Sequence, residues 1–244
     1  MHYIGGKFYL RHKIAAVLYR HNPNVPFYEP FVGACNICTE VPFKELWLND
    51  VSRDLIDMWR AACDGVFVPP ERLSENEYWI LQHSPSSPLR TFAGYACSFG
   101  GRWWGGYARE DTSDRNAANN RALYGKNSIL EKVRKLEGKK VRWTAGDYSA
   151  IRPAESVVYC DPPYLGTKAP GEGGIFNHGR FWNYVRSLVL DYKNNVYISE
   201  LQAPSDFVSI RHWPTQRMMR NDESNIIGER LFVHESQANG LEIK

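Results

Sequence analysis

The chain lacks any apolar run that could cross a membrane. Hydrophobic residues make up 43% of its 244 residues and charged residues 23%, an ordinary composition for a globular protein. No stretch approaches the ~18 consecutive apolar residues of a membrane helix. Residues 1–7 also lack the apolar core of a secretion signal. We therefore expect a cytoplasmic protein that has no membrane partner.

Cysteine is too sparse and too scattered for a disulfide framework. The five cysteines are odd in number, at positions 35, 38, 63, 97 and 160. Cys35 and Cys38 have zinc-like spacing, but no second Cys or His pair follows at the spacing of a zinc finger. We expect these two to be small buried residues, and we expect no metal site.

The common phosphate-binding motifs are missing as well. There is no P-loop lysine signature, and the glycine turn at residues 33–37 reads Gly-Ala-Cys-Asn-Ile rather than GxGxxG. This turn is not built for a pyrophosphate.

What the chain does contain is Asp161-Pro162-Pro163-Tyr164 directly after the apolar run 157–160. The run predicts a buried strand, and two prolines cannot continue a sheet ladder. The chain must therefore leave the sheet in a stiff extended turn. A carboxylate, a proline carbonyl and an aromatic ring then lie at the carboxyl end of a strand, where ligands bind in open α/β sheets. Such a group suits a planar ring that bears an amino group, although a proline-terminated strand with an incidental Asp is the alternative.

The pattern before residue 65 predicts one half of a doubly wound sheet. A helix within 8–21 precedes a strand at 27–31, a glycine turn and a short helix at 36–41. A second strand at 45–50 ends in an acid, and Ser52 is a plausible N-cap for the next helix.

The pattern breaks after this half. Residues 66–140 resemble no βαβ unit and predict an inserted, largely helical lobe, with a helix around 74–81 and a charged amphipathic helix at 128–140. The sheet resumes with strands at 141–143, 157–160 and 196–199, and a helix lies near 180–190. Residues 207–213 and 230–234 predict a closing antiparallel pair. We thus expect one domain from 1–65 and 141–244, and a lobe at 66–140.

Positive charge gathers in the lobe. The whole chain carries +3, but the eleven Lys or Arg and five acids of residues 98–142 give this segment +6 and leave the remainder at −3. A basic segment of this kind is typical of a polyanion site. A solvated charged helix would account for part of it.

Three features suggest the cofactor. The turn 29–35 has small residues that permit close backbone approach. Asp50 follows at the end of the next strand and can accept hydrogen bonds from both ribose hydroxyls of a nucleoside, although a surface acid is the alternative. Asp161 is the third. A nucleoside with a non-phosphate tail fits this arrangement, and S-adenosylmethionine is such a molecule.

With these residues the sequence resembles the D12 class, Dam-like DNA adenine methyltransferases of phage type. Tyr3-Ile4-Gly5-Gly6-Lys7 is similar to that family's N-terminal cofactor segment, residues 29–34 to its EPFVGAG turn and residues 48–50 to its ribose-binding acid. Residues 161–164 resemble its catalytic DPPY, and residues 98–107 its recognition lobe. Cys35 departs from the family's glycine, so we expect a weakened cofactor site.

The resemblance implies an α/β, Rossmann-like methyltransferase sheet and a role for each matching residue. The expected catalytic residues are Asp161, Pro162 and Tyr164. The expected cofactor-binding residues are Tyr3, Gly6, Lys7, Glu29, Phe31, Gly33, Ala34, Asp50, Asp147, Tyr148 and Asp161. The expected nucleic-acid contacts are Arg102, Trp103, Trp104, Arg109, Arg115, Arg121 and Lys126, although the two tryptophans could instead pack the lobe.

The implied activity is methyl transfer from S-adenosylmethionine to N6 of adenine in double-stranded DNA, as in restriction-modification systems. It implies a cytoplasmic monomer or weak dimer in a bacterial or phage-infected cell. The absence of a Pro-Cys nucleophile argues against carbon methylation of cytosine. A cytosine-amino or RNA methyltransferase, or a non-catalytic DNA-binding protein on the same fold, stays open.

Overall fold

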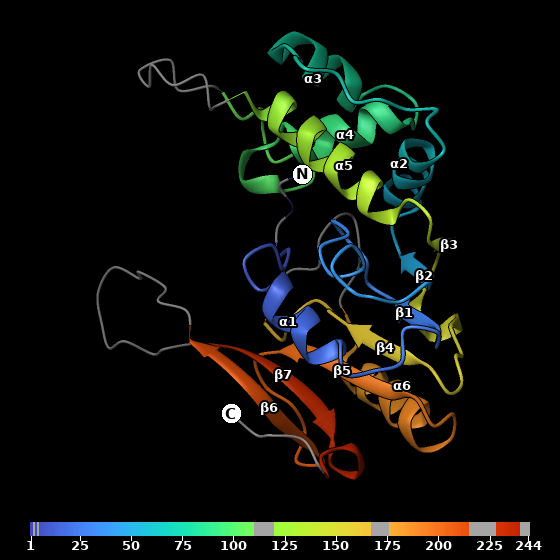
Figure 1. Ribbon diagram of the computed structural model, residues 1–244. Coiled ribbons are helices and arrows are strands. Elements are labelled where there is room, and N and C mark those ends of the chain that lie inside the picture. The colour runs from blue at the N-terminus through green and yellow to red at the C-terminus, as the bar shows by residue number, and fades with distance from the viewer. Residues whose placement is uncertain (2, 4, 110–119, 167–175, 215–227, 240–244) are drawn as a thin grey trace.

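The protein is built on one seven-stranded sheet flanked by helices (Figure 1). The computed structural model describes residues 1, 3, 5–109, 120–166, 176–214 and 228–239. Arg115, predicted to contact nucleic acid, lies outside these ranges.

The strand order confirms the predicted α/β, Rossmann-like fold. The sheet runs β3-β2-β1-β4-β5-β7-β6. The first five strands in this order are parallel: β3 (Lys140–Ala145), β2 (Glu45–Asp50), β1 (Phe27–Glu29), β4 (Val157–Cys160) and β5 (Asn195–Glu200). The closing strands β7 (Gly228–His234) and β6 (Phe207–Pro214) are antiparallel, as the sequence predicted.

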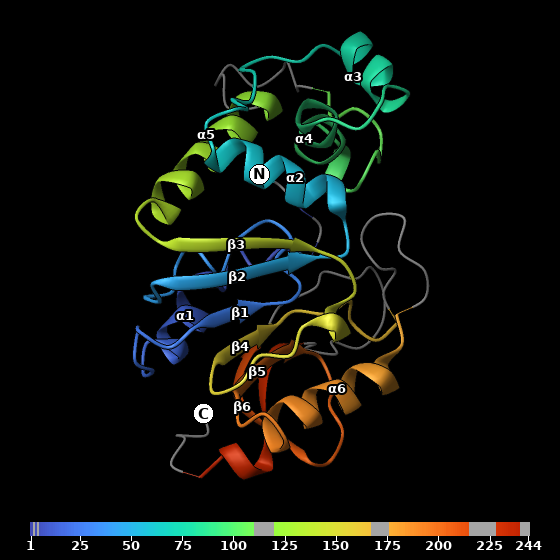
Figure 2. The ribbon, with the colours of Figure 1, turned by 90° about the vertical axis from the view of Figure 1, so that its right-hand side faces the viewer.

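The central strand β4 is buried on both faces, which explains its continuous apolar sequence. Val157 and Tyr159 point into the core shared with α1 (Arg11–Leu18). Val158 and Cys160 point to the other face, which α6 (His178–Leu190) covers. Figure 2 shows α1 behind the sheet and α6 in front of it. Two hydrophobic cores therefore fix the place where β4 ends.

The short helix expected at residues 36–41 does not form; this segment is a series of turns. Cys35 has a left-handed backbone (φ 55°), which interrupts any helix entering from the turn. The segment's polar groups find side-chain partners instead, because Glu29 accepts the Cys38 N–H and Thr39 donates to the Cys35 carbonyl. Side-chain bonds thus replace the helical ladder.

The predicted lobe region contains α3 (Glu75–Gln82), α4 (Pro88–Ala96), the 3-10 turn η1 (Phe99–Gly101) and α5 (Arg121–Leu136). The helix expected at 128–140 therefore begins earlier and ends before β3. These helices gather beyond β3, and α2 (Arg53–Cys63) lies between them and the sheet (Figure 2). Because α2 packs against both α4 and α5, it joins the lobe to the sheet. The boundaries at 66 and 140 stay a prediction.

Each of these helices begins at a side-chain cap. Ser52 accepts the Leu55 N–H, which confirms the predicted cap of α2. Ser74 and Glu77 form a capping box on α3, and Ser87 accepts the Arg90 N–H at the start of α4. No helix of the described residues is long and apolar enough to span a membrane.

We predict that Ser87→Ala lowers the free energy of unfolding by about 1 kcal/mol, because an N-terminal N–H of α4 loses its acceptor. Chemical denaturation followed by circular dichroism measures the change. Ser87→Asp is the control, since aspartate can make the same cap and should preserve stability. Equal losses in the two variants would show that the cap does not stabilise α4.

Candidate active site

The carboxyl ends of β1, β2 and β4 form the edge where the predicted residues meet. At the end of β1, a Cβ added to Gly33 would lie 3.1 Å from the Tyr3 ring, so this glycine admits the ring. A Cβ added to Gly6 would lie 2.9 Å from Nδ2 of Asn36. Two glycines thus let Tyr3 and Gly6 lie directly against the turn that follows β1.

Asp50 holds that turn from the end of β2. Its Oδ2 accepts the Gly33 N–H and its Oδ1 accepts the Ser52 N–H, both at 3.0 Å. Burial raises the pKa of Asp50, although these backbone donors act in the opposite direction. Each carboxylate oxygen still has acceptor capacity beyond its backbone donor.

Asp161, directly after β4, lies in a group of three charges in which Lys7 is buried and the carboxylates of Asp161 and Glu229 are partly buried. Lys7 Nζ is 2.6 Å from Asp161 Oδ1 and 3.3 Å from Glu229 Oε1. Burial raises the pKa of Asp161 to about 6; Lys7 lowers this pKa and the nearby Glu229 charge raises it. Burial lowers the pKa of Lys7, but the two carboxylates outweigh burial, so its pKa is raised. Lys7 is therefore held as an ammonium against Asp161.

Tyr164 completes this group. Its ring lies 4.7 Å from Lys7 Nζ, within cation–π range, and its hydroxyl donates to Glu229. The stiff turn predicted from the two prolines is present, since residues 161–164 form neither strand nor helix and Pro162 is buried. The turn thus places the Asp161 carboxylate and the Tyr164 ring against the same ammonium.

Glu229 was not predicted from the sequence. It is the second residue of β7, 222 residues after Lys7, and no motif surrounds it. Only the antiparallel return of β7 beside β5 brings it to the end of β4. An isolated acid at a strand start gives no signal for such a contact.

Phe31 and Tyr148 form an aromatic wall on the other side of the edge. Their ring centroids lie 5.2 Å apart, and Phe176 and Phe181 pack against both rings. Asp147, which caps the 3-10 turn η3 (Tyr148–Ala150), is half-exposed and pairs with Arg180 at 3.2 Å. Asp147 therefore lies at the rim while Tyr148 lies inside.

Two predicted cofactor residues have internal partners. Glu29 is buried, accepts the Cys38 N–H at 3.0 Å, and has a pKa raised well above its usual range by burial. The carbonyl oxygen of Ala34 accepts from Lys132 of α5. In the structure these two residues therefore make internal hydrogen bonds that support the turn.

Cys35 and Cys38 are fully buried free thiols, and burial raises the pKa of both. Within the described part of the chain, no group of three His, Cys, Asp or Glu could hold a metal ion. The departure from the family's glycine is instead a backbone matter, because Cys35 adopts a positive φ that glycine reaches without strain.

The predicted nucleic-acid residues divide into two groups. Arg102 and Arg121 are exposed, whereas Arg109 pairs with Glu75 at 2.8 Å and Lys126 with Glu71 at 3.0 Å. Trp103 and Trp104 are half-buried and pack against aromatic rings and Gly94 of the lobe. This packing favours the alternative role that the sequence left open for the tryptophans.

The site fits a nucleoside cofactor with a non-phosphate tail. The turn has a close-approach glycine, and Asp50 keeps acceptor capacity for hydroxyls. Phe31 and Tyr148 offer aromatic faces to a planar ring. Residues 3–83 match the family model of D12 class N6 adenine-specific DNA methyltransferases. This match contains the segment 3–7, the β1 turn and Asp50.

Over its N-terminal third the chain is similar to the D12 class of adenine-specific DNA methyltransferases, and this match implies S-adenosylmethionine as the methyl donor. The order of the sheet agrees with the Rossmann-like fold that the match implies. None of the curated proteins matches the chain.

Solved structures with a similar fold include yhhF from Escherichia coli, described as a methyltransferase. It is 10% identical, with a TM-score of 0.42, and the match covers 93% of this chain and 85% of that one. The rRNA methyltransferase aviRa from Streptomyces viridochromogenes is 11% identical, also with a TM-score of 0.42, covering 93% and 83%. Neither likeness says anything about the substrate of this chain.

We predict that Glu229→Gln lowers the pKa of Asp161 below its value of about 6, because it removes the neighbouring charge that raises this pKa. Lys7→Met should raise the pKa, because it removes the cation that lowers it. Carbon-13 NMR titration of protein labelled at aspartate carboxyls measures both. If the pKa of Asp161 moved in the same direction in both variants, the arrangement of Asp161 between Lys7 and Glu229 charges would be contradicted.

Proposed function

We propose that this methyltransferase transfers the methyl group to N6 of adenine in double-stranded DNA. The observation that carries the proposal is the position of Lys7 Nζ, an N–H donor 2.6 Å from Asp161 and beside the Tyr164 ring. An exocyclic amino group is also an N–H donor, attached to a planar ring. The pocket that accepts the ammonium therefore has the polarity and the aromatic face that an aminated base requires.

In this proposal Asp161 and the Pro162 carbonyl each accept one hydrogen of the adenine amino group. That nitrogen is a poor nucleophile while its lone pair is delocalised into the ring. Two acceptors draw it toward tetrahedral geometry, so that its lone pair turns to the methyl group. Positioning then supplies much of the rate enhancement. Asp161 must be ionised to do this fully.

The target base must leave the duplex, because its amino group cannot be reached inside the stack. The Tyr164 ring is the surface on which the extruded base would stack. Lys7 then has to give up Asp161 to the incoming amino group. Glu229, already 3.3 Å from Lys7, is the second carboxylate that keeps this ammonium paired.

The cofactor would lie across the edge between the glycine turn and Asp161. Residues that would hold it are Tyr3, Gly6, Lys7, Gly33, Asp50, Phe31 and Tyr148, with Asp147 at the rim and Glu29 and Ala34 supporting the turn. S-adenosylmethionine supplies an electrophilic methyl group on a sulfonium. Asp50 would accept hydrogen bonds from the ribose hydroxyls, and the aromatic wall would contact the adenine ring of the cofactor.

The lobe would bind the DNA. Arginines 102 and 121 are suited to phosphate or base-edge contacts. Arg109 and Lys126 can exchange their exposed carboxylate partners for phosphates at small cost, because exposed ion pairs contribute only about 0–1 kcal/mol. Trp103 and Trp104 keep the lobe packed, and Arg115 stays a predicted contact.

We predict that cells expressing the protein carry N6-methyladenine at one recurring sequence, and that Asp161→Ala abolishes it. Sequencing that detects modified bases gives the activity and the target together. Asp57→Asn is a matched control, since Asp57 is half-exposed on α2 and should leave methylation unchanged. Tyr164→Phe should retain more activity than Tyr164→Ala, because it preserves the stacking ring.

Methylated cytosine amino groups in the same experiment, or methyl transfer confined to RNA, would replace the adenine proposal with the corresponding alternative. Full activity of Asp161→Ala would contradict the proposed mechanism. Duplex binding with no calorimetric binding of S-adenosylmethionine would support a non-catalytic DNA-binding protein.

A further inference from the structure

The cofactor turn after β1 is held from behind by side chains on three separate segments. Three consecutive carbonyl oxygens each accept a side-chain donor. Trp59 Nε1 of α2 donates to Gly33 at 3.0 Å, Lys132 Nζ of α5 donates to Ala34, and Thr39 donates to Cys35 at 2.9 Å. Two of these donors come from helices that pack in or against the lobe. The turn's shape therefore depends on elements far outside its own motif.

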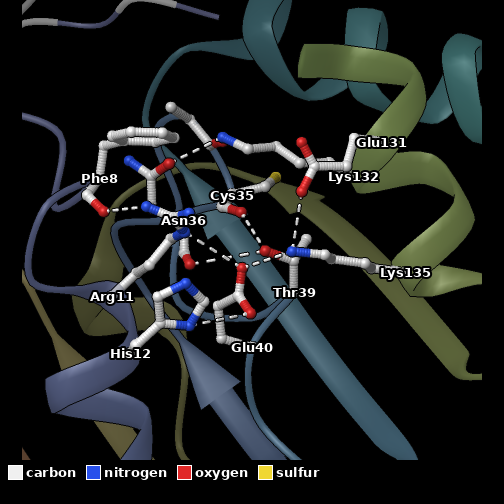
Figure 3. Close-up of polar contacts among 11 residues, drawn as sticks. Phe8, Arg11, His12, Cys35, Asn36, Thr39, Glu40, Glu131, Lys132 and Lys135 are labelled. Atoms are coloured by element: carbon white, nitrogen blue, oxygen red, sulfur yellow. Dashed lines mark hydrogen bonds and ion pairs between the residues drawn. The ribbon is translucent and has the colours of Figure 1, made fainter. Parts of the chain in front are cut away.

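Lys132 is the unusual member of this set. It is 5% exposed, and its second hydrogen bond goes to Asn36 Oδ1 at 2.7 Å (Figure 3). The Trp59 ring lies 5.9 Å from its Nζ. No ion pair joins Lys132 to a carboxylate among the described residues. Its direct contacts with two oxygen acceptors and a ring stabilise the buried charge.

A buried ammonium without a carboxylate partner is expensive, because burial disfavours the charged form. Burial lowers the pKa of Lys132, consistent with this cost. An apolar side chain would fill the same space more cheaply. A lysine is favourable here where its donors fix groups that must not move. Its acceptors are the Ala34 carbonyl and Asn36, both within or directly after the glycine turn.

We propose that Lys132 is a positioning residue for S-adenosylmethionine. Through its hydrogen bonds, Lys132 links the lobe, which binds DNA in the proposed function, to the cofactor turn. It touches no reacting atom; it acts through the backbone of residues 34–36. The inference rests on the cofactor site of the proposed function. It adds that α5, a lobe helix, sets the conformation in which the turn receives the cofactor.

The same helix offers a matched control. Lys135 lies one turn along α5 and pairs with Glu40 and Glu131 at 2.7 and 2.9 Å (Figure 3). It is 33% exposed, and both of these partners are side chains rather than turn carbonyls. Lys135→Met therefore removes a lysine from α5 without removing a donor from the turn.

The test is calorimetric titration of the full chain with S-adenosylmethionine, without nucleic acid. Lys132→Met should weaken binding about tenfold or more, the size expected for a lost hydrogen bond from a charged group. Lys135→Met should change the affinity by less than about twofold. Hydrogen exchange should show faster exchange of residues 33–38 in Lys132→Met alone.

A merely structural role would lower the unfolding midpoint and leave the affinity of the folded protein unchanged. A folded Lys132→Met with the parent affinity overturns the proposal. If this variant does not fold, the affinity of Lys132→Gln for S-adenosylmethionine tests the proposal instead. Weakening by about threefold or more supports the positioning role, and the parent affinity overturns it.

This experiment separates the two proposals. If the parent binds S-adenosylmethionine and Lys132→Met binds it with the same affinity, the positioning role fails while the adenine methylation proposal stands. If Lys132→Met weakens binding but cellular DNA carries no methyladenine, the substrate proposal fails while the positioning role stands.

Discussion

The site depends on one constraint: three charged side chains meet where β4 ends. Lys7, Asp161 and Glu229 come from the first residues, the middle and the last strand of the described chain. Removing Lys7 would leave two neighbouring carboxylates without the cation that offsets their charge, whereas removing either carboxylate would leave one ion pair. The group therefore joins the N-terminal segment and the antiparallel end of the sheet to the DPPY turn. Function and folding rely on the same contacts.

Net charge decides how this group behaves. Two carboxylates share one ammonium, so the group retains an excess negative charge when all three are ionised. This excess and burial together keep the pKa of Asp161 near 6 rather than at the low value of a simple ion pair. Near neutral pH the carboxylate is ionised, yet it is poised to exchange its partner. Under the proposed mechanism, a more tightly paired Asp161 would exchange Lys7 less readily for the amino group of the base.

Much of the fold could be predicted from the sequence, because its signals are local. The apolar run 157–160, the acid-ended strand 45–50 and the cap at Ser52 each follow from neighbouring residues. The location of the site could be predicted too, since the carboxyl ends of parallel strands lie at the same edge of a sheet. Glu229 and Lys132 could not be predicted, because their roles arise from contacts between segments about 100 to 220 residues apart. The expected helix at 36–41 failed for a related reason: side chains from elsewhere satisfy that backbone.

Cys35 shows how the local and distant effects combine. The sequence pointed to it as the weak position of the cofactor turn, on the basis of side-chain size. The structure moves the difficulty to the backbone, where a left-handed non-glycine residue costs about 1–2 kcal/mol. The hydrogen bonds that Trp59, Lys132 and Thr39 donate to carbonyls 33–35 are together large enough to offset this cost, at roughly 1 kcal/mol for each neutral bond and more for a charged donor. The turn can therefore keep its shape without the glycine, provided that the lobe helices supply their donors.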